Sequence, residues 1–450
     1  MNVHFIAIGG SAMHNLAIAL HNKGIQVTGS DDTIFEPSKT RLENKGLLPD
    51  KFGWFPEKIN TSIDAVILGM HAKENNPELL KAQEIGLKIY SYPEFLFEQS
   101  KEKTRVVIGG SHGKTTITSM ILHVMNYHNI NVDYMVGAQL EGFETMVHLT
   151  AENEFMVLEG DEYLSSPIDM RPKFHLYQPN IALISGIAWD HINVFPTFEN
   201  YIEQFSIFAD SLTNGGIMVY NEEDEVVKRV IENTQKPFKK YPYKTPNFKL
   251  VNGTTIIDTP EGEMPLEIFG VHNLQNLAGA KWICQHMSVN EDEFYEAIVS
   301  FKGASKRLEK IAENASTVVF KDFAHSPSKV EATTKAVKEQ YANRKVLACL
   351  ELHTYSSLNP EFLNEYRGAL EFADKAVVFY SPHAVEIKKL EKISEQQIKD
   401  AFKRDDLIVY TNPVEFKEFL FKQDFENMAL LLMSSGNYGG LDFNSFKDLI

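Results

Sequence analysis

The stretch that decides the fold is Arg105-Val106-Val107-Ile108-Gly109-Gly110-Ser111-His112-Gly113-Lys114-Thr115-Thr116. A short apolar run here feeds a glycine-rich turn, and a helical pattern follows from about Lys114 to Tyr127. Backbone N–H groups and the start of a helix would converge on one point that favours anions. The sequence therefore predicts that ATP phosphates bind at Gly110, Ser111, His112, Gly113, Lys114, Thr115 and Thr116.

Two side chains of this loop carry the expected chemistry. Lys114 would place a positive charge at the β and γ phosphates, and the Thr115 hydroxyl would bind Mg²⁺. The spacing departs from the usual phosphate-loop pattern, which would want a glycine at the position of Ile108. A glycine-rich turn with an ordinary surface lysine is the alternative. Few such turns, however, place Gly-Lys-Thr between a strand and a helix.

The same strand, turn and helix pattern occurs at the start of the chain. Val3 to Ile8 is an apolar run, Gly9-Gly10 is the turn, and Ala12 to Leu20 has helical spacing. Further strands are predicted to end at Asp31 and near Met70. Because strands alternate with helices, we expect an α/β fold with parallel, doubly wound sheets.

The length of 450 residues predicts two or three domains. We place a Rossmann-like domain at residues 1–100, a central domain with the phosphate loop at 101–302, and a third Rossmann-like α/β domain at 303–450. A polar stretch from Phe248 to Leu266, with turn signals at Asn252-Gly253 and Glu261-Gly262, predicts a small β-meander on the central domain.

Composition excludes several classes of function. The net charge, 44 − 61 = −17, disfavours a general affinity for nucleic acid or an anionic membrane. Cys284 and Cys349 are the only cysteines, so neither a disulfide framework nor a Cys-rich zinc module is expected. The N-terminus lacks the pattern of a signal peptide, and no apolar run reaches membrane-spanning length. We therefore expect a cytoplasmic protein, with its oligomeric state left open.

The motif Gly110 to Thr116 resembles the ATP signature of the Mur ligases, the amide-forming enzymes of peptidoglycan assembly, and further segments match that family in order along the whole chain. The resemblance implies a three-domain, ATP-dependent carbon–nitrogen ligase that uses Mg²⁺. Two of the segments, Glu159-Gly160-Asp161-Glu162-Tyr163 and Trp189-Asp190-His191, follow predicted strands at the same sheet edge as the loop. By resemblance, Glu159 and His191 bind the catalytic metal ions with Thr115. A solvated loop acid and a helix-capping histidine are the alternatives.

Other family segments imply nucleotide contacts. In His272-Asn273-Leu274-Gln275-Asn276, the resemblance assigns Asn273 and Asn276 to ATP, although helix capping alone would explain Asn273. In the third domain Arg307 would meet phosphate, Asp322 the ribose, and His325 the acceptor substrate. A surface turn at Ser326-Pro327 is the alternative for His325. The carbamylated lysine of some family members has no counterpart in Tyr201 to Ser206.

The first domain is expected to bind a UDP-sugar. Gly9, Gly10 and Ser11 do not form a proper G-x-G-x-x-G, so a dinucleotide site is weakly supported. The family uses this turn for the diphosphate. Ser30, Asp31 and His71 lie at the next strand ends and are the candidates for the uridine side, although Asp31 would also suit a simple loop acid.

Two acceptor amines remain open within the family. The runs around Glu159, Asp169, Trp189 and Met433 to Gly440 favour attachment of the tripeptide L-alanyl-γ-D-glutamyl-meso-diaminopimelate to UDP-N-acetylmuramate, in peptidoglycan recycling. Addition of L-alanine to the same UDP-sugar is the alternative. The segment Leu350 to Pro360 lacks the arginine that both kinds of relative carry there, which leaves the amine in doubt.

The expected reaction forms an acyl phosphate from ATP and the lactyl carboxylate, with Lys114, Glu159, His191 and His325 as catalytic residues, and releases ADP and phosphate. Three rivals stay open. They are a folate-polyglutamate type ligase, an NAD-dependent oxidoreductase that uses the Gly9 turn, and a nucleotide-binding regulator without catalysis.

Overall fold

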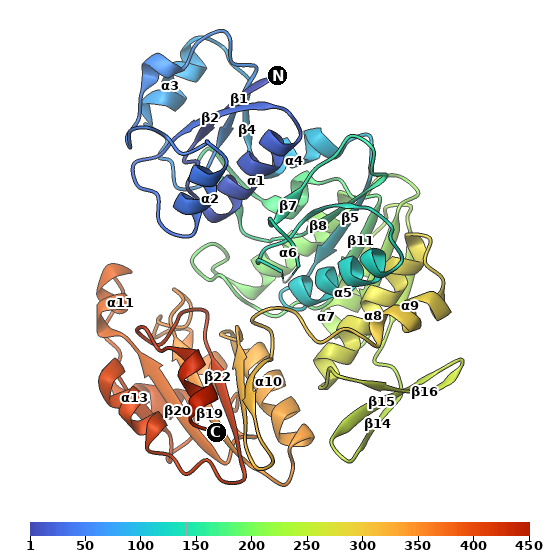
Figure 1. Ribbon diagram of the computed structural model, residues 1–450, viewed down its shortest axis with the longest axis vertical. Helices are drawn as coiled ribbons and strands as arrows, with labels where there is room; N and C mark the ends of the chain where they lie inside the picture. Colours follow the sequence, from blue (N-terminus) through green and yellow to red (C-terminus); the bar gives the residue numbers. More distant parts are fainter. Residues whose placement is uncertain (141) are drawn as a thin grey trace. The chain divides into compact units, whose positions relative to one another are not determined.

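The computed structural model describes residues 1–140 and 142–450, which divide into two compact units. Unit 1 comprises residues 1–187, 202–243 and 279–290, and unit 2 comprises 188–201, 244–278 and 291–450. Both units are built from mainly parallel sheets with helices on their faces, so the expected α/β class is confirmed (Figure 1).

The first sheet of unit 1 has four parallel strands in the order β2-β1-β3-β4. Its strands are β1 (Asn2–Ile6), β2 (Gln26–Ser30), β3 (Ala65–Leu68) and β4 (Ile89–Ser91), and its helices are α1 (Ser11–Asn22), α2 (Ser38–Asn44), α3 (Pro77–Glu84) and α4 (Tyr92–Ser100). The apolar side chains of β1 and β3 are buried on both faces, as expected for inner strands between helical layers.

The second sheet of unit 1 has seven strands in the order β13-β12-β11-β5-β8-β6-β7. Its strands are β5 (Thr104–Gly109), β6 (Asp133–Met135), β7 (Val147–His148), β8 (Phe155–Glu159), β11 (Ile181–Ile184), β12 (Ile217–Asn221) and β13 (Lys239–Tyr243). Only the β6–β7 pair is antiparallel. The flanking elements are α5 (Lys114–Tyr127), α6 (Phe198–Asp210), α7 (Glu225–Asn233), α8 (Val271–His286) and the antiparallel pair β9 (Leu164–Ser166) and β10 (Asp169–Pro172).

The sheet of unit 2 has six strands in the order β17-β18-β22-β19-β20-β21. They are β17 (Glu309–Glu313), β18 (Val318–Asp322), β19 (Lys345–Leu352), β20 (Lys375–Tyr380), β21 (Ile408–Tyr410) and β22 (Met428–Met433), with α9 (Glu291–Ile298), α10 (Pro327–Gln340), α11 (Pro382–Ile387), α12 (Glu395–Phe402) and α13 (Pro413–Phe421). Two apolar cores cover its faces, one with Val330 and Val337 of α10 and the other with Phe416 and Leu420 of α13 (Figure 1).

The predicted β-meander forms, but it belongs to unit 2 and not with the central sheet. It consists of β14 (Phe248–Val251), β15 (Thr254–Thr259) and β16 (Gly262–Leu266). Gln340 of α10 donates a hydrogen bond to the Gly253 carbonyl and lies 3.5 Å from the Thr255 hydroxyl. These contacts attach the meander to α10, and the sequence pattern gave no sign of them.

The segment that joins the two sheets of unit 1 is held by Arg105. Its guanidinium donates to the carbonyls of Ser100 and Lys101 at 3.0 and 2.9 Å, and to those of Tyr177 and Gln178 at 2.9 and 3.0 Å. The side chain therefore ties the end of α4 to the start of β5. Because the last carbonyls of a helix have no partner within the helix itself, the bonds to Ser100 and Lys101 help to complete the C-terminus of α4.

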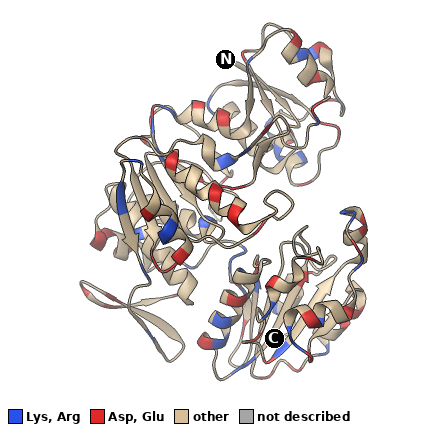
Figure 2. Cartoon of the chain, turned by 180° about the vertical axis from the view of Figure 1, so that it is seen from behind, with Lys and Arg blue, Asp and Glu red and all other residues tan. Residues whose placement is uncertain are grey.

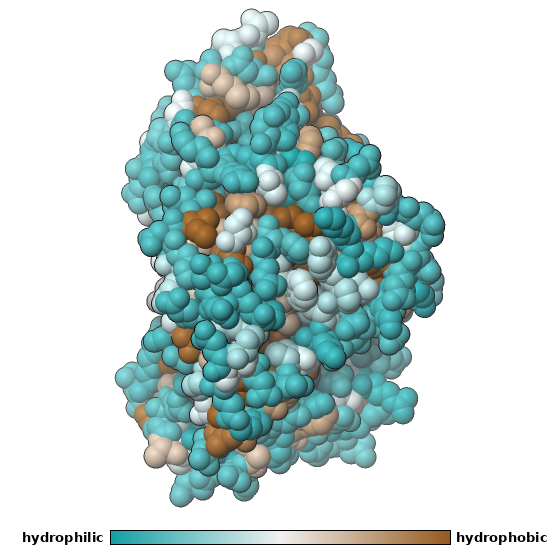
Figure 3. All heavy atoms as spheres, turned by 90° about the vertical axis from the view of Figure 1, so that its right-hand side faces the viewer, coloured by the Kyte–Doolittle hydropathy of each residue, from teal (hydrophilic) through white to brown (hydrophobic). Residues whose placement is uncertain are grey.

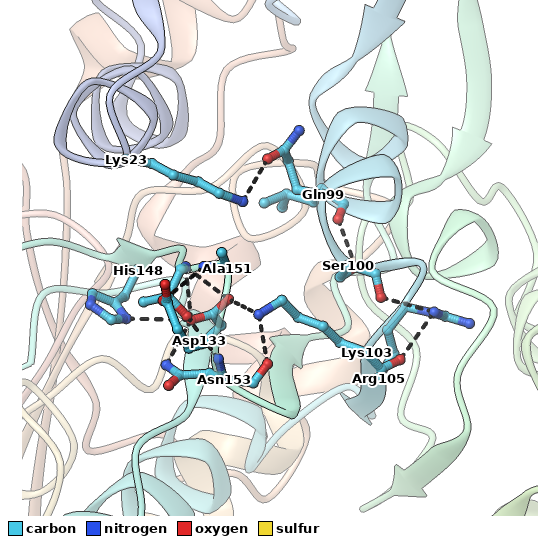
Figure 4. Close-up of polar contacts among 12 residues, drawn as sticks. Lys23, Gln99, Ser100, Lys103, Arg105, Asp133, His148, Ala151 and Asn153 are labelled. Carbon is cyan, nitrogen blue, oxygen red and sulfur yellow. Dashed lines mark hydrogen bonds and ion pairs between the residues drawn. The ribbon is translucent and has the colours of Figure 1, made fainter.

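Asp133 also binds the segment between α4 and β5, through Lys103. Lys103 lies 2.8 Å from the fully buried Asp133 carboxylate, as Figure 4 shows. Thr150 and Asn153 also donate to Asp133, at 2.8–3.0 Å. Although burial acts to raise its pKa, hydrogen bonds from His148, Lys103 and Thr150 lower the pKa of Asp133 to about 2. The carboxylate is therefore charged at neutral pH.

The molecular surface is mixed in charge. Basic and acidic residues are interspersed over the helices (Figure 2), and the face in Figure 3 is largely hydrophilic with separate apolar patches. Over residues 1–140 and 142–450, the helices are all too short or too polar to span a bilayer.

Candidate nucleotide and ligase site

The phosphate loop runs from the end of β5 to the start of α5, as predicted. Gly110 has φ +130° and Gly113, which precedes the helix, has φ +79°. A Cβ atom on Gly110 would lie 2.1 Å from the Ser185 Oγ atom. Only glycine fits this position without a shift of the loop, because the conformation and the close contact both exclude a side chain.

Residues at the end of β11 pack directly against the loop. The Ser111 N–H donates to the Gly186 carbonyl at 2.9 Å, and the Ser185 hydroxyl donates to the His112 carbonyl. A Cβ on Gly186 would lie 2.3 Å from the His112 ring. Ser185 and Gly186 thus shape the loop, and the sequence analysis assigned neither. The available signal was the Ser-Gly pair that follows the strand Ile181–Ile184.

Lys114 lies across the loop. Its Nζ atom donates to the Gly110 carbonyl at 2.6 Å and to Glu162 Oε2 at 2.5 Å. Burial acts to lower the pKa of Lys114, but the carboxylates of Glu162, Asp161 and Glu159 outweigh it and raise the pKa. The ammonium therefore stays charged, which suits a phosphate ligand. Glu162 thus holds the Lys114 side chain, a contact that the sequence pattern did not predict.

Thr115 and Glu159 lie together at the carboxyl ends of the neighbouring strands β5 and β8. The Thr115 hydroxyl donates to Glu159 Oε1 at 2.6 Å, and the Gly137 N–H donates to Oε2 at 2.5 Å. Glu159 is 6% exposed. A hydroxyl and a carboxylate are oxygen ligands of the kind that Mg²⁺ takes together with water, so these two residues fit the ion.

The remaining metal-site prediction, His191, lies in unit 2. Its backbone has φ +56°, and its carbonyl accepts hydrogen bonds from the N–H groups of Val194 and Phe195. Its role as a ligand stays a prediction. Within residues 1–140 and 142–450, His, Cys, Asp and Glu side chains do not gather in threes suited to a metal ion.

The residues predicted to bind the UDP-sugar lie at the carboxyl edge of the first sheet. The Gly9 N–H donates to Asp31 Oδ2 at 2.7 Å, and burial raises the pKa of Asp31. Ser30 is fully buried, and its hydroxyl has no hydrogen-bond partner. Ser11 begins α1 after Gly10, and His71 is exposed after β3, the strand that neighbours β1. The sheet therefore brings these residues to one edge.

The two asparagines predicted to contact ATP lie in the first turns of α8. The Asn273 side chain donates to the Phe269 carbonyl at 2.9 Å, and Asn276 is buried. An N-terminal cap would accept a hydrogen bond from a helix N–H through its side-chain oxygen. Asn273 instead donates a hydrogen bond through its side-chain amide to the Phe269 carbonyl, and this bond orients the amide.

Asp322 joins the two predicted nucleotide segments of unit 2. Its carboxylate accepts hydrogen bonds from the N–H groups of Leu308 and Ala324, both at 2.5 Å, and burial raises its pKa. The Arg307 guanidinium lies 4.5 Å from the centre of the Phe323 ring. Asp322 thus fixes the turn that carries Arg307 and the turn that carries His325.

His325 is largely buried, with its side chain 11% exposed, beside Asp190. Its Nδ1 atom lies 2.8 Å from the Phe323 carbonyl, and its Nε2 atom lies 3.9 Å from Asp190 Oδ2. Burial, followed by the positive charge of Lys329, lowers the pKa of His325 to about 4. At neutral pH the ring is therefore neutral. Since Nδ1–H faces a carbonyl, the lone pair is on Nε2, where it would accept a proton or a hydrogen bond.

Comparison with known proteins gives consistent matches along the chain. Residues 2–104 match the family described as "Mur ligase family, catalytic domain", and residues 108–284 match "Mur ligase middle domain". A protein of Caldicellulosiruptor bescii named UDP-N-acetylmuramate–L-alanine ligase is 32% identical over 390 residues, which cover 83% of this chain and 82% of that protein.

Two solved structures share the fold over nearly the full length. The UDP-N-acetylmuramate–alanine ligase of Thermotoga maritima has a TM-score of 0.71 at 18% identity, covering 100% of this chain and 98% of the other. The murein peptide ligase of Psychrobacter arcticus has a TM-score of 0.67 at 21% identity, covering 99% and 98%.

Proposed function

Because the chain belongs to the Mur ligase family of ATP-dependent ligases, we propose that it joins an amine to the lactyl carboxylate of UDP-N-acetylmuramate, with L-alanine as the first candidate amine. The observation that carries the proposal is Lys114, held over the loop by the Gly110 carbonyl and Glu162 beside the Thr115–Glu159 pair. This arrangement supports the proposal of a site for phosphate and a hydrated cation.

L-Alanine replaces the tripeptide that the sequence motifs favoured. The relative from Caldicellulosiruptor bescii is named for L-alanine, and it is more similar to this chain than the murein peptide ligase, whose likeness extends to the fold alone. The name of the more similar relative thus supports L-alanine, the alternative amine, better than the tripeptide, which was the main expectation. The tripeptide stays as second candidate because of the run Met433 to Gly440.

In the proposed reaction, the lactyl carboxylate attacks the γ-phosphorus of ATP, and the bond to the bridging oxygen of ADP breaks. The amine then attacks the carbonyl carbon of the acyl phosphate, and inorganic phosphate leaves as the amide forms. Lys114 would offset charge at the transferred phosphoryl group. His325, with its lone pair on Nε2, would take the proton that the amine loses.

The other roles follow the sequence expectation. We propose that Gly110 to Thr116, Asn273, Asn276, Arg307 and Asp322 hold ATP, that Thr115, Glu159 and His191 hold Mg²⁺, and that Gly9, Gly10, Ser11, Ser30, Asp31 and His71 hold the UDP-sugar. Mg²⁺ would supply Lewis-acid charge at the phosphates. The domains proposed are residues 1–100, 101–302 and 303–450.

The test is phosphate release from ATP with UDP-N-acetylmuramate, with L-alanine and the tripeptide L-alanyl-γ-D-glutamyl-meso-diaminopimelate assayed in parallel. Release with L-alanine alone supports the first candidate, and release with the tripeptide alone replaces it with the second. Release with neither amine refutes both. Omission of UDP-N-acetylmuramate is the control, since a folate-polyglutamate type ligase would not depend on it.

A further inference from the structure

Asp190 is a buried carboxylate, 4% exposed, whose contacts lie within unit 2. Lys329 Nζ, from the first turns of α10, lies 3.6 Å from Asp190 Oδ2. On its other oxygen, Asp190 accepts the N–H of His191 at 2.8 Å. Asp190 therefore contacts Lys329 through one carboxylate oxygen and the backbone of His191 through the other.

The charge of Asp190 needs a compensating cation, because an unpaired buried carboxylate is strongly destabilising. Lys329 Nζ lies 3.6 Å from Asp190 Oδ2, closer than His325 Nε2 at 3.9 Å. Lys329 is therefore the cation placed to compensate the carboxylate.

Asp190 fixes an uncommon backbone conformation at the next residue. His191 has φ +56°, the left-handed region that non-glycine residues seldom adopt. The hydrogen bond from its N–H to Asp190 stabilises this turn, as aspartate side chains often do. Trp189 supports the same turn through its Nε1–H, which donates to the Phe195 carbonyl at 3.0 Å, and through an edge contact with the Phe362 ring.

We propose that Lys329 is a positioning residue for the ligase reaction, which acts through Asp190 to hold the turn that presents His191. The inference rests on the proposed function, because it concerns the geometry of that site. Lys329 does not need to touch a substrate in this role. Its loss would displace His191 while leaving the phosphate loop of unit 1 as it is.

The test compares Lys329→Met, which keeps the length of the side chain without its charge, with Lys329→Arg. The expected result for Lys329→Met is a fall in kcat of about tenfold to a hundredfold, as for small displacements of a reacting group. The KM for UDP-N-acetylmuramate should change by less than about twofold, since its proposed residues are in the first sheet. Lys329→Arg should recover most of kcat.

The matched control is Lys338→Met, on the same helix. Lys338 pairs with the partly exposed Asp374 at 2.7 Å, and such pairs contribute little to stability. Its kcat should stay at the wild-type value. A Lys329→Met enzyme with wild-type kcat, or one whose loss Lys329→Arg does not relieve at all, would overturn the inference.

A second measurement does not depend on activity. Lys329→Met, Asp190→Asn and the double variant are compared by urea unfolding. If the two residues pair, Asp190→Asn should restore part of the free energy of unfolding lost in Lys329→Met, because no unpaired charge remains. Additive losses would overturn the pairing. A wild-type enzyme inactive with both amines would refute the proposed function, and this cycle would still decide the pairing.

Discussion

The Lys114 Nζ atom lies 2.5 Å from Glu162 Oε2, and the two side chains are only 14% and 2% exposed. Lys114 is thus paired inside the protein as well as aimed at the phosphate loop. The residue proposed to bind phosphate also neutralises a buried carboxylate, so activity and stability are linked at one side chain.

Lys114→Ala is expected to reduce phosphate release by at least about a hundredfold, since a charge at the transferred group is lost. It should also lower the free energy of unfolding by about 3 kcal/mol, because the buried Glu162 carboxylate loses the ammonium group that it pairs with. Phosphate assays and urea unfolding measure the two effects. The double variant with Glu162→Gln should regain stability without regaining activity. An active Lys114→Ala enzyme would rule out the proposed role.

Gly110→Ala should disable ATP binding without preventing folding of the first sheet. The new Cβ would lie 2.1 Å from Ser185 Oγ at a φ of +130°, so the loop must move. Calorimetric titration with ATP should show affinity weakened by at least about tenfold. The control is Gly24→Ala, at φ +84° with open space around the new Cβ. Equal affinity in both variants would contradict the prediction.

Asp133→Ala should be among the more destabilising single changes in unit 1. The substitution leaves Lys103 buried without its partner and removes the acceptor for Thr150 and Asn153. We expect a loss of about 3 kcal/mol in the free energy of unfolding. Urea unfolding measures it, with Glu418→Ala, in the exposed Lys422–Glu418 pair, as the control that should lose less than about 1 kcal/mol.

The pH dependence of stability should include a contribution from His325. Its pKa is lowered from 6.5 to about 4 in the folded protein, so the unfolded chain binds more protons between these values. The stabilisation is therefore complete above about pH 6.5 and is lost as the pH falls towards 4, by at most about 1.4 kcal/mol per pH unit.

Urea unfolding at about pH 7.5 and about pH 5.5 measures this contribution. His325→Gln should lose less stability on acidification than the wild-type protein. His383→Gln is the control, since that side chain is 79% exposed. The same pH dependence in wild type and His325→Gln would contradict the prediction.

Much of the fold follows from short-range patterns. The apolar run and glycine turn predict β5 and α5, and the helix spans Lys114–Tyr127 as expected. The strand β13 is different, since Lys239–Tyr243 has the sequence KKYPY and lies at the sheet edge. Its pairing depends on the register with β12, which local sequence does not encode.

The candidate site divides in the same way. The roles of Lys114 and Thr115 could be predicted because both residues belong to the phosphate-loop motif itself. The partner of Lys114, Glu162, is 48 residues away, and Lys329 reaches Asp190 from another element altogether. Such contacts arise from tertiary packing. Motif spacing therefore indicates which residues react or bind ligands, but not which residues position those side chains.

The carbonyls bound by Arg105 on both sides of the segment that joins the two sheets affect how the chain can be divided in the laboratory. A fragment ending near residue 100 would retain α4 but lose the guanidinium that completes its end. A fragment starting after Lys101 would keep Arg105 with its Tyr177 and Gln178 acceptors but would lose those of Ser100 and Lys101. Each piece would be less stable than the same residues in the whole protein, so weak UDP-sugar binding by an isolated first domain would reflect damage from the cut.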